Sequence, residues 1–301
     1  MKVIVMFFLV SRLILAQQVG DSTFNPQLPH PLYKTGSGPT ISIDEGHNNF
    51  HTQSGRYKPF ADILVKDGYN VKPYSKKFSL KELDGTKILV ISNALNERNK
   101  EDWTLPTPSA FTDDEIAQIV KWVTDGGNLF LISDHMPFPG AANNLALKFG
   151  FKMNNGFAGD TTHLGAPDLF TKKDKTLNIN FITEGRNESE SVDSIYSFTG
   201  QAFQIPDNAT PALTLNSNFV SLMPDTAWNF KNNTPKISVA GWNQGAVSKF
   251  GKGKIAVWGE AAMFSAQISK NKKVGMNAPY AKNNWRLLLN IIHWLDGKLG
   301  K

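Results

Sequence analysis

Three short apolar runs constrain the fold of this 301-residue chain more than any other feature. They are Lys87–Ser92 (KILVIS), Asn128–His135 (NLFLISDH) and Lys254–Glu260 (KIAVWGE). A strand with one face in water alternates apolar and polar residues, whereas a strand buried on both faces reads as a continuous apolar run. Such strands are typical of parallel sheets that helices cover on both sides. The runs therefore predict an α/β fold with a buried, mainly parallel sheet.

Segments with helical periodicity separate these runs. Arg56–Asp67 carries apolar residues at helical spacing and is followed by Gly68, a common helix stop. Asp113–Thr124 also has an apolar stripe, and Thr112 with Glu115 forms a capping box at its start. The resulting order β-α-β-β-α-β-α predicts a flavodoxin-like, doubly wound sheet. Further elements are expected as strands at Ile41–Asp44 and Asn70–Tyr74, as antiparallel segments at Pro211–Leu222, Lys236–Trp242 and Gly245–Phe250, and as helices at Ala141–Phe149 and Lys282–Leu295.

The chain is expected to consist of a leader, a lead-in and one domain. Residues 1–16 begin with a lysine near the start, continue as an apolar run and end at Ala16, which is the pattern of a secretory signal peptide. The run is shorter than the roughly 20 residues that a membrane anchor needs, so we expect a secreted or periplasmic protein without an anchor. Residues 17–39 hold four prolines and are expected to be extended. Residues 40–301 are expected to form a single α/β domain with an irregular insertion at about 151–206.

Cysteine content and charge exclude several classes of function. The chain has no cysteine, which excludes disulfides, thiolate metal ligands and a cysteine nucleophile. Its net charge of +6 comes from scattered lysines, and no basic helix or RNA-binding motif is present in the sequence. We therefore expect a solvated basic surface and no nucleic-acid partner.

The segment Thr40–His51 joins the first predicted strand to a dense group of polar side chains. The carboxyl ends of parallel strands meet along one edge of a sheet, where open α/β folds bind ligands, so this group predicts a functional site. The spacing of His47 and His51 would suit a metal ion on a helix, although the glycine and asparagines around them favour a loop. The polar residues of this segment are Asp44, Glu45, His47, Asn48, Asn49 and His51.

Two later strands end in the same way. Asp134 and His135 directly follow an apolar run, where titratable side chains need hydrogen-bond partners. Glu260 closes the run KIAVWG, and it is either a carboxyl group with a tuned pKa or a cap for the helix that follows. In the insertion, the sequence GDTTH offers Asp160 and His163.

These residues define a predicted site at the carboxyl edge of the sheet. A divalent metal held by histidines and carboxylates would activate water, with Glu45 or Glu260 as general base. Without a metal, His135 paired with a carboxylate would activate water instead. We assign catalytic roles to Glu45, His135 and Glu260, ligand binding to Asn48, Asn49, Asp134 and Asp160, and metal ligation to His47, His51 and His163.

The order of these motifs resembles the class I glutamine-amidotransferase-like superfamily. Gly126–Gly127, followed by an apolar strand and His135, is similar to the pattern of its ThuA-like branch. Phe198–Phe203 (FTGQAF), Gly259–Gln267 (GEAAMFSAQ) and Asn290–Leu295 (NIIHWL) resemble signatures of an uncharacterised bacterial family with the same fold. The resemblance implies the fold and points toward carbohydrate-related work.

One departure from the family's pattern limits the possible activities. Amidotransferases carry a cysteine at the nucleophile elbow and a histidine after the last core strand, where this chain has Ser133–Asp134–His135 and Glu260. Glutamine hydrolysis through a thioester is therefore excluded. Two hypotheses remain, a hydrolase that acts on carbohydrate or related substrates and a non-catalytic module that binds a carbohydrate or a protein. Either would take a small-molecule or glycan ligand. Several aromatic residues are candidates to stack on such a ligand, or else they pack in the core: Trp103, Phe138, Phe157, Tyr196, Phe198, Trp228 and Trp242.

Overall fold

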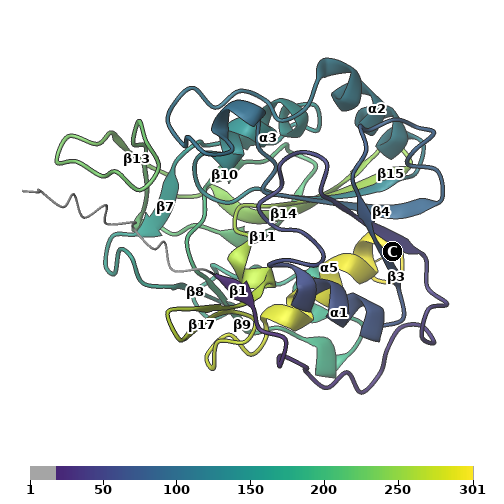
Figure 1. Ribbon diagram of the computed structural model, residues 1–301. Helices are drawn as coiled ribbons and strands as arrows, with labels where there is room; N and C mark the ends of the chain where they lie inside the picture. Colours follow the sequence, from purple (N-terminus) through teal and green to yellow (C-terminus); the bar gives the residue numbers. More distant parts are fainter. Residues whose placement is uncertain (1–17, 301) are drawn as a thin grey trace, which may run out of the picture.

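The computed structural model describes residues 18–300, so the predicted signal peptide over residues 1–16 lies outside the described residues. Its centre is a nine-stranded sheet with the order β3-β2-β4-β5-β15-β14-β10-β6, in which β11 also pairs with β14 (Figure 1). Numbered along the chain, the five parallel strands lie in the order 2-1-3-4-5, which is that of flavodoxin-like folds. The predicted fold class is confirmed. The parallel strands are β2 (Thr40–Asp44), β3 (Asn70–Tyr74), β4 (Thr86–Ser92), β5 (Asn128–Ile132) and β15 (Gly253–Trp258).

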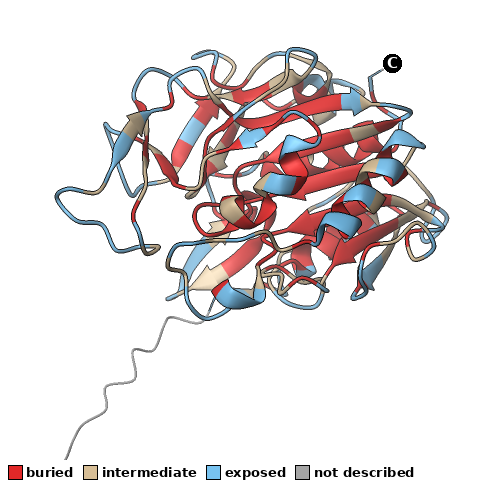
Figure 2. Cartoon of the chain, turned by 90° about the horizontal axis from the view of Figure 1, so that it is seen from above, coloured by how far each residue is buried: buried red, intermediate tan, exposed pale blue. Residues whose placement is uncertain are grey.

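Helices cover both faces of this sheet, which is why its central strands read as apolar runs (Figures 1 and 2). Neighbouring residues of β4 point to opposite faces. Ile88 and Val90 join the core beneath α1 and α5, whereas Leu89 and Ile91 join the core beneath α2 and α3. The helices are α1 (Lys58–Lys66), α2 (Asp113–Thr124), α3 (Phe138–Leu147), α4 (Phe181–Glu184) and α5 (Asn284–Leu295).

The predicted capping box of α2 is confirmed. The hydroxyl oxygen of Thr112 accepts a hydrogen bond from the backbone N–H of Glu115 at 3.3 Å, and the Glu115 carboxylate accepts one from the backbone N–H of Thr112 at 3.0 Å. These bonds satisfy N–H groups that the first turn of a helix leaves free. Burial of Glu115 also brings its carboxylate against the loop that follows β2, which is described below.

The other half of the central sheet is antiparallel. A tight turn with Gly251 at φ +57° joins β14 to β15. The predicted segment over Pro211–Leu222 is antiparallel, but a turn at residues 216–218 divides it into two strands that belong to different sheets. The antiparallel strands of the central sheet are β6 (Lys152–Met153), β10 (Phe203–Gln204), β11 (Thr210–Thr214) and β14 (Asn243–Phe250).

The segment from 151 to 206 is more regular than the sequence suggested. Its two ends, β6 and β10, extend the central sheet, and the part between them forms short strands of its own. Three small sheets flank the central sheet. The first contains β7 (Phe157–Asp160), β12 (Phe219–Leu222) and β13 (Lys236–Ser238), and the second contains β8 (Asp168–Thr171) and β9 (Ser194–Ser197). The third contains β1 (Val19–Gly20), β16 (Ala266–Ser269) and β17 (Lys272–Gly275). Short 3₁₀ turns are η1 (Glu97–Asn99), η2 (Glu188–Glu190) and η3 (Ala262–Phe264). Within residues 18–300, every helix is too short or too polar to cross a membrane.

A close backbone contact at the start of β15 leaves no space for a side chain on Gly253. A Cβ atom on Gly253 would lie 2.1 Å from the carbonyl oxygen of Gly127 and 2.3 Å from that of Val123, and backbone atoms cannot rotate away. We expect Gly253→Ala to lower the free energy of unfolding by about 3 kcal/mol, because the strand must shift. Gly85→Ala is the control, since Gly85 has φ +73° and open space around it, and should cost about 1 kcal/mol. Equal losses in urea unfolding would contradict this packing.

Candidate functional site

The carboxyl ends of β5 and β15 enclose a cavity of about 190 Å³. Ile132 pairs with Trp258 in the parallel register, so the residues that follow each strand emerge side by side. Asp134, His135 and Glu260 therefore line one cavity, together with His51 from the loop after β2. The expectation that separate strand ends meet at one site holds for these residues.

Asn93 positions two of these side chains, and sequence reasoning missed it. Its side-chain oxygen accepts a hydrogen bond from the backbone N–H of Asp134 at 2.9 Å, and its side-chain nitrogen lies 3.3 Å from Nδ1 of His51. Asn93 adopts φ +49°, a left-handed conformation that asparagine tolerates better than most residues. Its position directly after the apolar run of β4 is the signal that could have identified it.

Main-chain groups hold both carboxyl groups in place. One oxygen of Asp134 accepts the backbone N–H of His135 at 2.8 Å. Glu260 is fully buried, and its two oxygens accept the backbone N–H groups of Ala262 and Met263, each at 2.7 Å. Glu260 thus caps the turn η3, which is one of the two roles that the sequence predicted for it. It also lines the cavity.

Burial changes the ionisation of this carboxyl pair. Removal from water disfavours the charged form and raises the pKa of Asp134 to about 7. Burial also raises the pKa of Glu260 well above its usual value, and the nearby charge of Asp134 raises it further. Burial and the mutual repulsion of the two carboxylates therefore both favour keeping a proton on the pair.

Both histidines of the cavity are neutral. Burial lowers the pKa of His135 to about 4, and Nδ1 lies 2.7 Å from the carbonyl oxygen of Met136. A carbonyl oxygen only accepts hydrogen bonds, so Nδ1 carries the proton and Nε2 carries the free lone pair. Burial, followed by the charge of Arg56, lowers the pKa of His51 to about 3.

Aromatic rings surround the imidazole of His135. The ring stacks on Phe157 with centroids 4.5 Å apart and meets Trp228 edge-on at 4.6 Å. Trp103 and Phe138 lie within 6.2 Å of it. Trp228 is 54% exposed although it lines the cavity, so its ring is available to a ligand at the entrance.

His47 lies in a separate, structural cluster. Its Nδ1 is 2.9 Å from a carboxylate oxygen of Asp44, its Nε2 is 3.1 Å from one of Glu115, and its ring stacks on Phe78. Burial alone would lower the pKa of His47, but the hydrogen bonds and charges of the two carboxylates outweigh burial and raise it. His47 therefore joins the loop after β2 to the start of α2.

The prediction that Glu45 lies in the same site as His135 and Glu260 is wrong. Its carboxylate accepts the backbone N–H of Gln53 at 2.6 Å and stabilises the loop, and it does not line the cavity. Asn48 and Asn49 likewise lie elsewhere, in the wall of a second cleft. The side chain of Asn49 also donates to Asp44 and to the carbonyl oxygen of Ser92, which holds the loop against β4. The strand ends meet as predicted, but the loop after β2 turns most of its polar groups away from the cavity.

Asp160 and His163 form a third group, in the flanking segment. Burial would raise the pKa of Asp160, but hydrogen bonds from Thr162 lower it, and His163 lies 3.2 Å from a carboxylate oxygen of Asp168. Neither residue lines the cavity at the sheet edge.

Among residues 18–300, no group of three or more His, Asp or Glu side chains is arranged to hold a metal ion. The structure therefore does not bring His47, His51 and His163 together at one site, because each lies in a different cluster.

Comparisons with known proteins concern the fold. No protein-family model and no curated protein matches the chain. The solved N-terminal domain of mmIFT52 aligns at 14% identity with a TM-score of 0.61, covering 85% of this chain and 97% of that one. A protein described as ThuA-like from Bacteroides uniformis aligns at 12% identity and a TM-score of 0.49, over 89% and 95% of the two chains. A protein described as a component of GMP synthase, from Thermoplasma acidophilum, aligns at 14% identity and a TM-score of 0.42, over 85% and 96%.

Identities this low bear on the fold alone. The chemistry of the site must be argued from the residues of this chain.

The carboxyl pair makes stability depend on pH. A carboxyl whose pKa is raised by folding contributes stability at low pH, and that contribution is lost as the pH rises through the folded pKa. We expect Asp134→Asn to become more stable relative to the wild type as the pH rises from about 4 to about 7, by roughly 2 to 4 kcal/mol at about 1.4 kcal/mol per pKa unit. Urea unfolding across this range measures the difference.

Asp160→Asn is the matched control for this prediction. Because the pKa of Asp160 is lowered in the folded protein, its stabilising contribution is lost only as the pH falls through that folded pKa. The difference between Asp160→Asn and the wild type should stay constant above about pH 5. A constant difference for Asp134→Asn as well would show that Asp134 ionises normally.

Proposed function

We propose that this protein is a hydrolase that acts on a hydroxylated substrate, such as a glycoside or a sugar ester, in the cavity at the ends of β5 and β15. The observation that supports this most directly is the pair Asp134 and Glu260, two buried carboxyl groups in one cavity with raised pKa values. Two titratable groups that hold one proton between them can act as an acid and a base at neutral pH.

The proposed reaction is hydrolysis by general acid and base. The protonated carboxyl of the pair donates its proton to the leaving-group oxygen as the bond between that oxygen and carbon breaks. A water molecule attacks the carbon and gives its proton to the ionised carboxyl of the pair. The lone pair on Nε2 of His135 accepts a hydrogen bond from this water and orients it. The reaction thus consumes one water and leaves the enzyme with the same number of protons.

The walls of the cavity suit a ring-shaped, hydroxylated ligand. Trp103, Phe138 and Trp228 supply flat apolar faces, and the carboxyl groups and His135 supply hydrogen-bond partners. A sugar ring presents C–H groups on its faces and hydroxyl groups at its edge, which matches this arrangement.

A non-catalytic binding module is the second candidate. Glu260 favours it, because both of its oxygens already accept main-chain hydrogen bonds and a structural cap explains its position. In such a module, the same aromatic walls and polar groups would bind a sugar without hydrolysing it.

Enzyme assays with matched variants separate the two candidates. A panel of nitrophenyl glycosides and acetylated sugars should reveal turnover by the wild type, with a bell-shaped dependence of kcat/KM on pH, because only the form of the pair that holds one proton is active. Asp134→Asn and His135→Ala should lower kcat/KM by about 10² or more. Glu45→Gln is the control, since Glu45 lies outside the cavity, and it should retain wild-type activity.

Two results would count against the hydrolase. Turnover that survives in Asp134→Asn and in His135→Ala would place the reaction elsewhere. Absence of turnover over the panel, combined with calorimetric binding of a sugar that Trp228→Ala weakens, would favour the binding module instead.

A further inference from the structure

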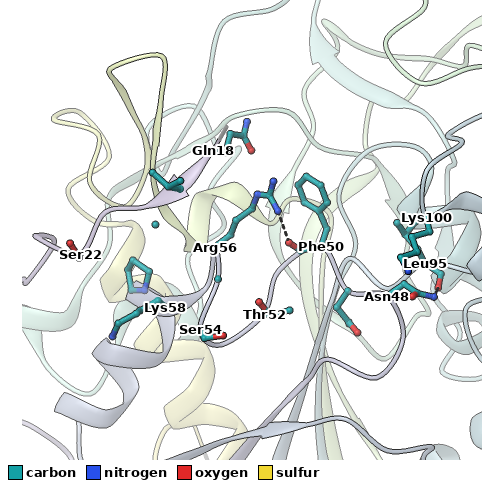
Figure 3. Close-up of a pocket in the computed structure, with 15 residues that line it drawn as sticks. Gln18, Ser22, Asn48, Phe50, Thr52, Ser54, Arg56, Lys58, Leu95 and Lys100 are labelled. Atoms are coloured by element: carbon teal, nitrogen blue, oxygen red, sulfur yellow. Dashed lines mark hydrogen bonds between the residues drawn. The ribbon is translucent and has the colours of Figure 1, made fainter. Parts of the chain in front are cut away.

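A second cleft, of about 560 Å³, lies beside the first cavity. Figure 3 shows the residues that line it. The two share Gln18 and Phe50 in their walls. The second cleft contacts the loop after β2 through Asn48 and the loop after β4 through Leu95. Strand order reverses between β2 and β4, and open α/β sheets bind ligands in the crevice outside the strand ends at such a switch point.

The charged residues that line this cleft are all cations. They are Arg56, Lys58 and Lys100, and no Asp or Glu is among the lining residues. Lys58 pairs with Asp62 at 2.7 Å, and Lys100 lies 3.9 Å from Glu97. Both lysines are more than half exposed, so water and a nearby carboxylate already compensate their charges.

Arg56 differs from the two lysines because it has no counter-ion. Its guanidinium lies over the ring of Phe50, 3.8 Å from the centroid, and Nη1 donates to the backbone carbonyl of Phe50 at 3.1 Å (Figure 3). Its Nε is buried and has no hydrogen-bond partner among the described residues. No carboxylate of residues 18–300 lies within 4.0 Å of it, and residues 1–17 contain no Asp or Glu.

An unpaired guanidinium in a partly buried cleft favours a negatively charged ligand. Burial disfavours the charge of Arg56, as the lowered pKa of this side chain indicates. The planar fork of arginine donors matches two oxygens of a phosphate, sulfate or carboxylate group. Thr52 and Ser54 add hydroxyl groups to the same cleft.

We propose that this cleft binds an oxyanion, with the guanidinium of Arg56 as its principal ligand. The positive charge of Arg56 also acts on His51 in the neighbouring cavity, where it helps to lower the pKa of that histidine. A bound anion therefore lies next to the proposed catalytic cavity, and a ligand that fills both would carry an acidic group. The anion site itself does not depend on the proposed hydrolase activity.

Isothermal titration calorimetry tests the site with sodium phosphate, sodium sulfate and sodium acetate, at an ionic strength held constant with sodium chloride. We expect the wild-type protein to bind at least one of these anions at a single saturable site. Binding of phosphate or sulfate without acetate would assign the site to tetrahedral groups, and binding of acetate would assign it to carboxylates. Asp134→Asn should bind the same anion unchanged, which keeps this test separate from that of the hydrolase.

Substitutions of residues in the cleft show where the anion binds. Arg56→Gln should weaken it about tenfold or more, because a charge-assisted bidentate contact is lost. Lys58→Glu places a negative charge at the exposed rim without disturbing the core, and it should weaken binding several-fold. Arg286→Gln is the control, since Arg286 also stacks on a ring, that of Trp285, but lies outside this cleft. Absence of saturable binding to the folded wild type, or wild-type affinity in Arg56→Gln, would overturn the proposal.

Discussion

Parallel pairing of β5 with β15 is the constraint on which the site depends. The two strands are far apart in the sequence, yet Ile132 lies beside Trp258 in the register. Their ends therefore deliver Asp134 and Glu260 to the same cavity, where both side chains are buried. Exclusion of water raises the pKa of both carboxyl groups, so the hydrogen-bonding pattern of the sheet determines the ionisation of the site.

Burial of Asp134 and Glu260 lowers the stability of the folded protein, because a buried carboxyl group costs free energy unless it keeps a proton or accepts hydrogen bonds. Backbone N–H groups offset part of this cost, because two of them donate hydrogen bonds to Glu260 and one donates to Asp134. Asn93 adds a further bond to the backbone of Asp134 from a left-handed conformation. Strain and burial concentrated around one cavity are typical of a functional site rather than of a packed core.

The fold and the strand-end residues could be predicted from the sequence, because apolar runs and capping residues act locally. The capping box of Thr112 and Glu115 is an example. The second contact of Glu115, with His47 across 68 positions, depends on where α2 packs and has no local signal. For the same reason the sequence could not show that Glu45 and Asn49 stabilise their own loop, or that His51 alone of this segment's histidines reaches the cavity.

The most direct test of this account is an NMR titration of the side-chain carboxyl carbons of Asp134 and Glu260, assigned by comparison with Asp134→Asn and Glu260→Gln. We expect the two signals to titrate together, with a midpoint near 7 for Asp134 and one well above 4.5 for Glu260. Independent titration of both groups at their ordinary values, 3.8 and 4.5, would show that no proton is shared in the cavity and would contradict the account.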